Sequence, residues 1–257
     1  MSDRPKLKVP EQTKKDFVSC VQSAVGDEIK EDMLKLRTTN SRAARIWDLI
    51  NTDLYDISDV HGCKTYLVHR GPWGMVVVYE PATCTLYTFM REARFKQIRK
   101  KVRAGEDKSH YLRLLVKSLN GNLECQYQED ALFPDEAPEK LSEKDNKIID
   151  DMLVQLRADQ AKITNHVVVL FESVTRPYQL VSIRAVMLDK NLAVFSQEDW
   201  TRLITVEESA IIDPITNSNA PENNPSHGLK LKAKSLRRKE VKDKNLKTAN
   251  KDNKKSQ

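Results

Sequence analysis

The sequence has few of the residues that build disulfide frameworks, metal clusters or nucleotide-binding loops. Its 257 residues include four cysteines and seven glycines, and no two cysteines form a Cys-x-x-Cys pair. Cysteines this sparse and scattered predict reduced thiols in a cytoplasmic protein rather than a disulfide scaffold. The glycines stand singly apart from Gly71 and Gly74, so no Gly-rich loop for a nucleotide phosphate is present.

Long apolar runs and the serine elbow of hydrolases are also missing. No apolar stretch approaches the roughly 18 residues that cross a membrane as a helix. The first ten residues, MSDRPKLKVP, contain no apolar run typical of a secretory signal. No Gly-x-Ser-x-Gly motif occurs. We therefore predict a protein with no membrane partner and no cofactor, which binds a partner rather than catalysing a reaction.

Positive charge is abundant but unevenly distributed. The formal net charge is +6, yet residues 229–257 hold twelve Lys or Arg against three Asp or Glu, a local charge of +9 that leaves −3 for the rest. The basicity of the whole chain therefore belongs to its C-terminal end. Because this end also has little apolar surface to offset ordering entropy, we predict a disordered Lys-rich tail over 211–257.

The periodicity of apolar residues predicts an α+β fold, with antiparallel β-meanders, helices packed on the sheet and a helical N-terminus. The middle strand of the first meander is apolar at successive positions, 75–79, so we expect helices on both of its faces. Predicted helices cover 11–36 with a weak point at Gly26, a second stretch opened by Arg42 and Arg45, 91–103, a stretch ending at Asn120, a stretch starting at Ser142, and 197–204; predicted strands cover 64–70, 74–80, 84–90, 166–173, 179–189 and 192–196.

The domain organisation follows from shifts in composition. We predict a flexible lead over 1–10, a body over 11–210 and the tail over 211–257. The acidic, Pro-bearing stretch 128–141 resembles a linker, so the body could alternatively consist of two sub-units, 11–127 and 142–208. His110 and His166 are interpreted as a helix-cap and a strand residue.

The predicted helix 91–103 has the strongest local charge in the body. Seven Lys or Arg stand against Glu92 alone, which gives +6 within thirteen residues. Like charges three and four residues apart destabilise a helix, so an anionic partner is expected. Trp73, at a turn tip, could form an aromatic platform beside this helix with Tyr66, Tyr87 and Arg70. The predicted nucleic-acid contacts are Arg91, Arg94, Lys96, Arg99, Lys100, Lys101, Arg103 and Trp73.

A weaker metal-site hypothesis concerns Asp59, His61 and Cys63. In an extended segment these three side chains would share one face, and all three are metal-ligand types. A polar entry into the first strand explains the same segment. A metal-dependent nuclease would also need a Glu-x-Lys or Asp-x-Lys group, but Ala82 occupies the lysine position after Glu80.

The leading prediction is therefore a non-enzymatic protein that contacts nucleic acid through the basic helix and the tail. The alternative is a protein–protein interaction module whose basic helix docks an acidic partner. A metal-dependent hydrolase is the third hypothesis.

Overall fold

The computed structural model of the chain describes residues 7–57, 62–70, 73–106, 110–125, 142–158 and 162–205. The predicted linker 128–141 and tail 211–257 lie outside these residues, as does most of the lead, so the domain boundaries stay predictions. In the described part of the chain, no helix is long and apolar enough to cross a membrane.

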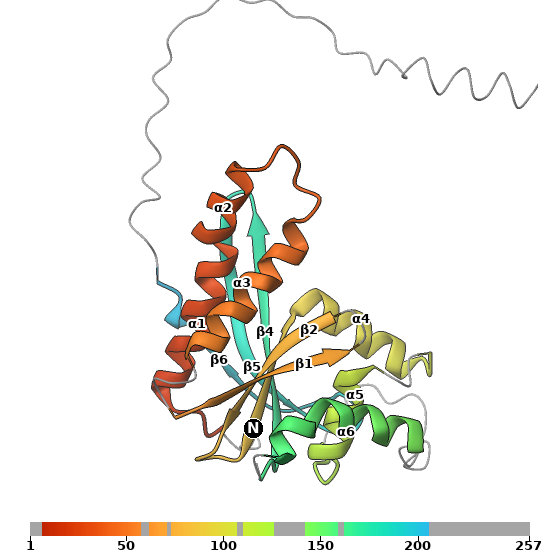
Figure 1. Cartoon of the computed structure of the whole chain (residues 1–257). Coiled ribbons are helices and arrows are strands. Elements are labelled where there is room, and N and C mark those ends of the chain that lie inside the picture. The colour runs from red at the N-terminus through yellow and green to blue at the C-terminus, as the bar shows by residue number, and fades with distance from the viewer. Residues whose placement is uncertain are drawn as a thin grey trace, which may run out of the picture. The chain divides into compact units, whose positions relative to one another are not determined.

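Helices and strands together confirm the predicted α+β class and the helical N-terminus (Figure 1). The helices are α1 Glu11–Val25, α2 Asp27–Leu34, α3 Arg42–Ile57, α4 Glu92–Arg103, α5 Tyr111–Leu119 and α6 Glu143–Ala158. The strands are β1 Lys64–Arg70, β2 Trp73–Glu80, β3 Thr85–Arg91, β4 Asn165–Thr175, β5 Tyr178–Leu188 and β6 Val194–Asp199, followed by the 3-10 turn η1 Thr201–Leu203.

The described strands form one sheet in the order β1-β2-β3-β4-β5-β6. Each of the two predicted meanders is antiparallel within itself, whereas β3 and β4 pair in parallel from Thr85↔Asn165 to Arg91↔Phe171. A parallel pair needs a crossover connection, and α4, α5 and α6 lie within it. The sequence patterns had predicted the meanders but not the parallel pairing that joins them.

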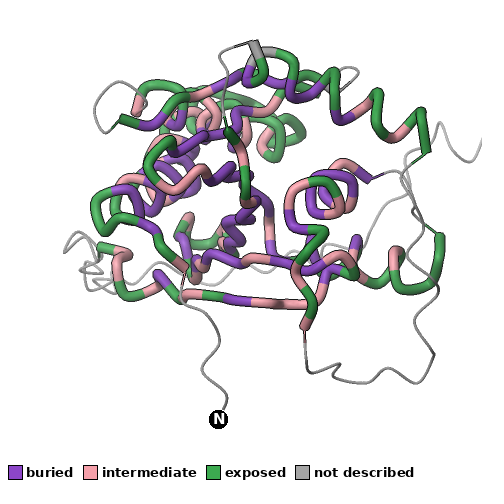
Figure 2. Tube along the Cα trace, turned by 90° about the horizontal axis from the view of Figure 1, so that it is seen from below, coloured by how far each residue is buried: buried purple, intermediate pink, exposed green. Residues whose placement is uncertain are grey.

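The helices cover both faces of the sheet. Val76 and Val78 belong to the core cluster built with α1, α2 and α3, whereas Val77 and Tyr79 belong to the cluster built with α5 and α6. A third cluster joins α4 and α5 to β3, β4 and β5. Figure 2 shows the buried positions following the strands and the inner sides of the helices. The prediction that helices flank β2 on both faces is thereby confirmed.

Two local predictions had different outcomes. The weak point at Gly26 is a true break, because α1 ends at Val25 and α2 begins at Asp27. The predicted helix over 197–204 is wrong. Gln197 and Glu198 instead pair with residues of β5, so the strand continues to Asp199 and only a short 3-10 turn follows.

Candidate nucleic-acid interface

α4 is held on the sheet by a narrow apolar stripe. Phe95 and Ile98 are buried and Val102 is partly buried, in the same cluster as Leu170 of β4. Their spacing of three and four residues puts them on one face of the helix. The basic residues between them consequently occupy the sides and the outer face of α4.

The C-terminal end of α4 is closed by the backbone. Gly105 has a φ of 71°, and the N–H groups of Gly105 and Glu106 donate to the carbonyls of Val102 and Lys101 at 3.1 and 3.0 Å. This pair of hydrogen bonds is a Schellman motif, for which glycine is favoured because the backbone is left-handed. The last turn also carries basic side chains, which interact favourably with the negative end of the helix dipole.

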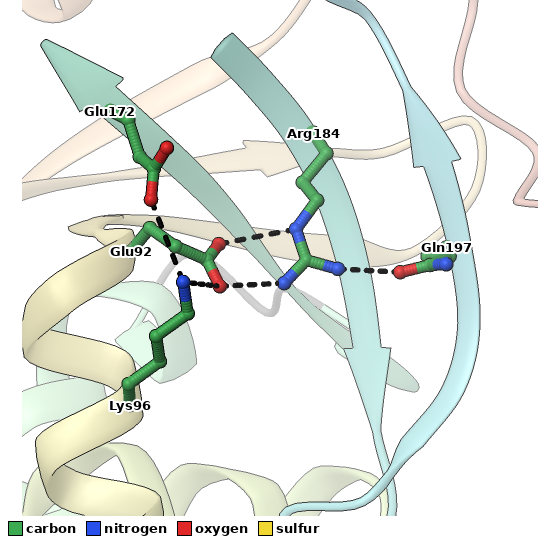
Figure 3. A network of polar contacts seen from close by, with 5 residues as sticks. All are labelled: Glu92, Lys96, Glu172, Arg184 and Gln197. Carbon is green, nitrogen blue, oxygen red and sulfur yellow. Dashed lines mark hydrogen bonds and ion pairs between the residues drawn. The ribbon is translucent and has the colours of Figure 1, made fainter.

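The first turn of α4 is tied to the sheet by an ion-pair network (Figure 3). The nearly buried Glu92 accepts two hydrogen bonds from the guanidinium of Arg184 on β5, at 2.8 and 3.1 Å. Arg184 also donates to Gln197 of β6. The ammonium of Lys96 lies 3.7 Å from Glu92 and 3.6 Å from Glu172 of β4. Lys96 therefore already faces two carboxylates and is a poor candidate for an external anion.

Besides Lys96, four cations of α4 are exposed to solvent, namely Arg94, Lys100, Lys101 and Arg103. Arg94 donates to the neutral amide of Gln97 at 3.4 Å. Among the residues that the structure describes, none of the four forms an ion pair with a carboxylate. These four side chains are the part of the predicted interface that is available to a partner.

Arg91 and Arg99 have different surroundings from these four. Both are half-buried, and Arg91 is the last residue of β3 rather than part of the helix. The guanidinium carbon of Arg91 lies 5.8 Å from the centre of the Phe171 ring. Burial lowers the pKa of Arg91, and the nearby charge of Arg42 lowers it further. Arg91 therefore faces α3, across the sheet from the apolar stripe of α4.

Trp73 is exposed as predicted, with 67% of its surface accessible at the start of β2. Tyr66 and Tyr87 are buried, on opposite faces of the sheet, and the Tyr87 hydroxyl donates to Glu80 at 3.0 Å. The predicted joint surface of Trp73 with these tyrosines is therefore wrong, because successive core strands direct their side chains into two separate clusters. The side chain of Arg70 lies outside the described residues.

The predicted metal site is described only at Cys63, because Asp59 and His61 lie outside the described residues. Cys63 is buried, which raises its pKa to about 11, and the Glu80 carboxylate contributes to the rise. Glu80 itself is buried at the end of β2 and accepts a hydrogen bond from Thr83 at 2.6 Å. Within the described ranges, no three His, Cys, Asp or Glu side chains come together as metal ligands.

His166 and Asn120 form a buried polar group between α5 and the sheet. The Asn120 amide donates to the carbonyls of His166 and Leu188 at 2.8 and 2.9 Å and accepts from the His166 N–H at 2.8 Å. The His166 ring lies 2.9 Å from the Thr88 hydroxyl, and burial lowers its pKa to about 3. This neutral histidine holds strands together, and His110 accepts a hydrogen bond at the start of α5.

A family model matches residues 6–249 of the chain. The protein belongs to a family of unknown function, DUF5986. No curated protein and no solved structure matches the chain. The family therefore places the chain among related sequences without assigning an activity.

Two features of this region were missed by sequence reasoning. Glu92 had been counted as one acid among seven bases, whereas its partner Arg184 is 92 residues further along the chain. Arg42 had been named only at the start of the second predicted helix, and its approach to Arg91 had not been foreseen. A local signal for Arg42 exists, since it stands four residues before the buried Ile46.

Proposed function

We propose that the protein binds nucleic acid, without catalysing a reaction on it, through the exposed side chains of Arg94, Lys100, Lys101 and Arg103. The observation that carries the proposal is their exposure without a carboxylate partner among the described residues. Lys100 and Arg103 are three residues apart and repel each other by a few tenths of a kcal/mol, a small cost that a chain of phosphates would offset.

Contacts of this kind would hold the phosphate backbone without reading the base sequence. Trp73 offers a second type of contact. Because β2 runs antiparallel to β3, the start of β2 lies at the end of the sheet where β3 leads into α4. An exposed indole there suits stacking on an unpaired base, which is worth roughly 1–3 kcal/mol.

The test is binding of a fluorescent single-stranded oligonucleotide to the full-length protein at about 50 mM salt, where phosphate contacts are strongest. The variant Lys100→Glu, Lys101→Glu, Arg103→Glu is expected to bind at least tenfold more weakly. A matched control reverses three other exposed lysines, with Lys15→Glu, Lys144→Glu and Lys147→Glu. This control changes the net charge equally and is expected to bind nearly as well as the unmodified protein.

Equal losses in the two triple variants would show that binding follows net charge, and the α4 interface would then be rejected. The alternative partner, an acidic protein, predicts a different result in competition. If polyglutamate displaces the oligonucleotide at the same concentration of charged groups, α4 is a general polyanion surface that fits an acidic protein equally well.

A further inference from the structure

Arg42 occupies the first position of a buried series on α3. Ile46, Ile50 and Leu54 are buried at intervals of four residues and form the face of α3 that packs on the core. Residues four apart lie on the same side of a helix, so Arg42 continues this face by one turn. Its side chain is half-buried, as this position requires. A core-facing series therefore ends in a positive charge.

Arg91 ends a second core-facing series, on β3. Tyr87 and Phe89 point toward α1, α2 and α3, and Arg91 follows at the same period of two. Arg91 pairs with Phe171 of β4, and its guanidinium lies over the Phe171 ring. Burial beside an aromatic ring fixes this side chain at the rim of the core.

The two series meet at this rim. Trp47 of α3 packs on the Phe171 ring with centroids 5.7 Å apart, so the first turns of α3 lie beside the end of β4 (Figure 1). Arg42 is close enough for its charge to lower the pKa of Arg91, an effect that adds to the larger one of burial. Arg42 and Arg91 are thus two half-buried cations at the same rim, on the two elements that pack around Phe171.

No carboxylate compensates this pair in the part of the chain that the structure describes, where neither arginine forms an ion pair or a side-chain hydrogen bond. The neighbouring Arg45 differs, because it donates to Asp32 at 2.6 and 3.1 Å. Partly desolvated like charges are unfavourable unless an anion lies between them. Such a rim favours the binding of an anion.

We propose that Arg42 and Arg91 together bind a phosphate monoester group. A monoester carries a charge of about −1.5 to −2 near neutral pH, which matches two guanidinium groups, whereas a carboxylate compensates one. Guanidinium forks also fit phosphate oxygens with paired hydrogen bonds. The N-terminus of α3 begins at Arg42 and adds its positive dipole end. The site uses none of the exposed α4 cations and so stands apart from the proposed function.

The test compares thermal unfolding of the full-length protein in sodium phosphate and in sodium chloride at equal ionic strength. Phosphate at about ten times its dissociation constant is expected to raise Tm by roughly 3–6 °C. Arg42→Gln is expected to abolish this rise, and in chloride to leave Tm unchanged or higher because repulsion is relieved. Arg176→Gln, an exposed arginine in the turn between β4 and β5, is the control and is expected to keep the full rise.

A rise in Arg42→Gln equal to that of the unmodified protein would overturn the proposal, as would no rise in the unmodified protein. Arg42→Lys provides a second variant that keeps the charge and the fold but loses the fork. Phosphate is expected to raise the Tm of this variant only slightly. If it responds fully, the paired geometry claimed for Arg42 is wrong.

A further arm identifies the source of the phosphate. A 5′-phosphorylated oligonucleotide that binds several-fold more tightly than its 5′-hydroxyl form, with the difference lost in Arg42→Gln, supports a nucleic-acid end. Equal binding of both oligonucleotides, together with an intact response to inorganic phosphate, supports a small phosphate compound at the same site. The α4 variant Lys100→Glu, Lys101→Glu, Arg103→Glu should keep its phosphate response, which separates failure of this site from failure of the α4 interface.

Discussion

The two ends of α4 carry charge of different kinds. At the beginning, Glu92 is nearly buried and receives two hydrogen bonds from Arg184, while Lys96 bridges Glu92 and Glu172 (Figure 3). At the end, Lys100, Lys101 and Arg103 are exposed and form no ion pair with a carboxylate within the described residues. The same helix therefore has an anchored end and an open end.

A count of charges along a helix therefore does not measure a binding surface. The first turn meets β4 and β5, so its charges must be paired when they are buried, since an unpaired buried charge is costly. The last turns face water, where unpaired cations cost little and are free to contact an anion. Only the second group supplies an interface.

The largest effect is expected from Glu92→Gln. Removing the carboxylate leaves Arg184 half-buried without its ion-pair partner, so the free energy of unfolding should fall by about 3 kcal/mol. Urea denaturation measures this loss. The control is Glu143→Gln, an exposed acid in the first turn of α6, which should change stability by less than about 0.5 kcal/mol. Equal effects of the two variants would mean that the first turn of α4 is not anchored.

Acid is expected to weaken the core while leaving the open end charged. His166 has a folded-state pKa of about 3, below its ordinary value of 6.5, because it is buried. Its contribution to stability is therefore complete above pH 6.5 and is lost as pH falls from 6.5 toward 3, by up to about 1.4 kcal/mol per pH unit. Because of His166, the free energy of unfolding should be about 2 kcal/mol lower at pH 5 than at pH 7.

The variant His166→Gln should have a flatter stability profile between pH 7 and pH 5, even though its stability at pH 7 is lower. Lysine and arginine do not titrate in this range, so binding by the folded protein should change little. A stability profile of the same slope in the variant would contradict the assignment to His166.

Neutralising the open end should affect binding but not folding. The variant Lys100→Gln, Lys101→Gln, Arg103→Gln is expected to bind an oligonucleotide about tenfold more weakly. The slope of log K against the logarithm of the salt concentration should become shallower by about 2–3. Its Tm should stay within about 2 °C, since exposed substitutions are nearly neutral. If this variant instead had a much lower Tm and an unchanged affinity, the last turns of α4 would stabilise the fold rather than bind the partner.

The smallest effect is expected from Lys96→Gln. Its ammonium is solvent-accessible and already close to two carboxylates, so the loss should be below about 0.5 kcal/mol in stability and below about twofold in affinity. Titration of the same oligonucleotide measures it. If this variant binds as weakly as a variant of Lys100 or Lys101 alone, the anchored end also belongs to the interface.

Local patterns predicted most elements of the fold closely. The three strands expected at 64–70, 74–80 and 84–90 are β1, β2 and β3 within one residue at each end, and the helix expected at 91–103 begins at Glu92. Periodicity carries this information because each segment must direct its apolar side chains to one place. The end of the body was predicted less well, since Gln197 and Glu198 are held in β6 by pairing with β5.

The candidate sites were less predictable, because they depend on residues distant in sequence. The exposure of Trp73 follows from its turn position, whereas the burial of Tyr66 and Tyr87 depends on which helices cover each face of the sheet. Arg91 was assigned to the basic helix, yet as the last residue of β3 it faces α3.

Composition and periodicity are properties of local stretches, so they were enough to predict the α+β class, the position of the basic helix and the absence of a Gly-rich phosphate loop. Which charges of α4 are available, and which arginines lie at the same rim of the core, depends on the tertiary structure. The physical reason is that pairing and burial join segments as distant as Glu92 and Arg184, or Arg42 and Arg91, and the free energy of a charge depends on those neighbours.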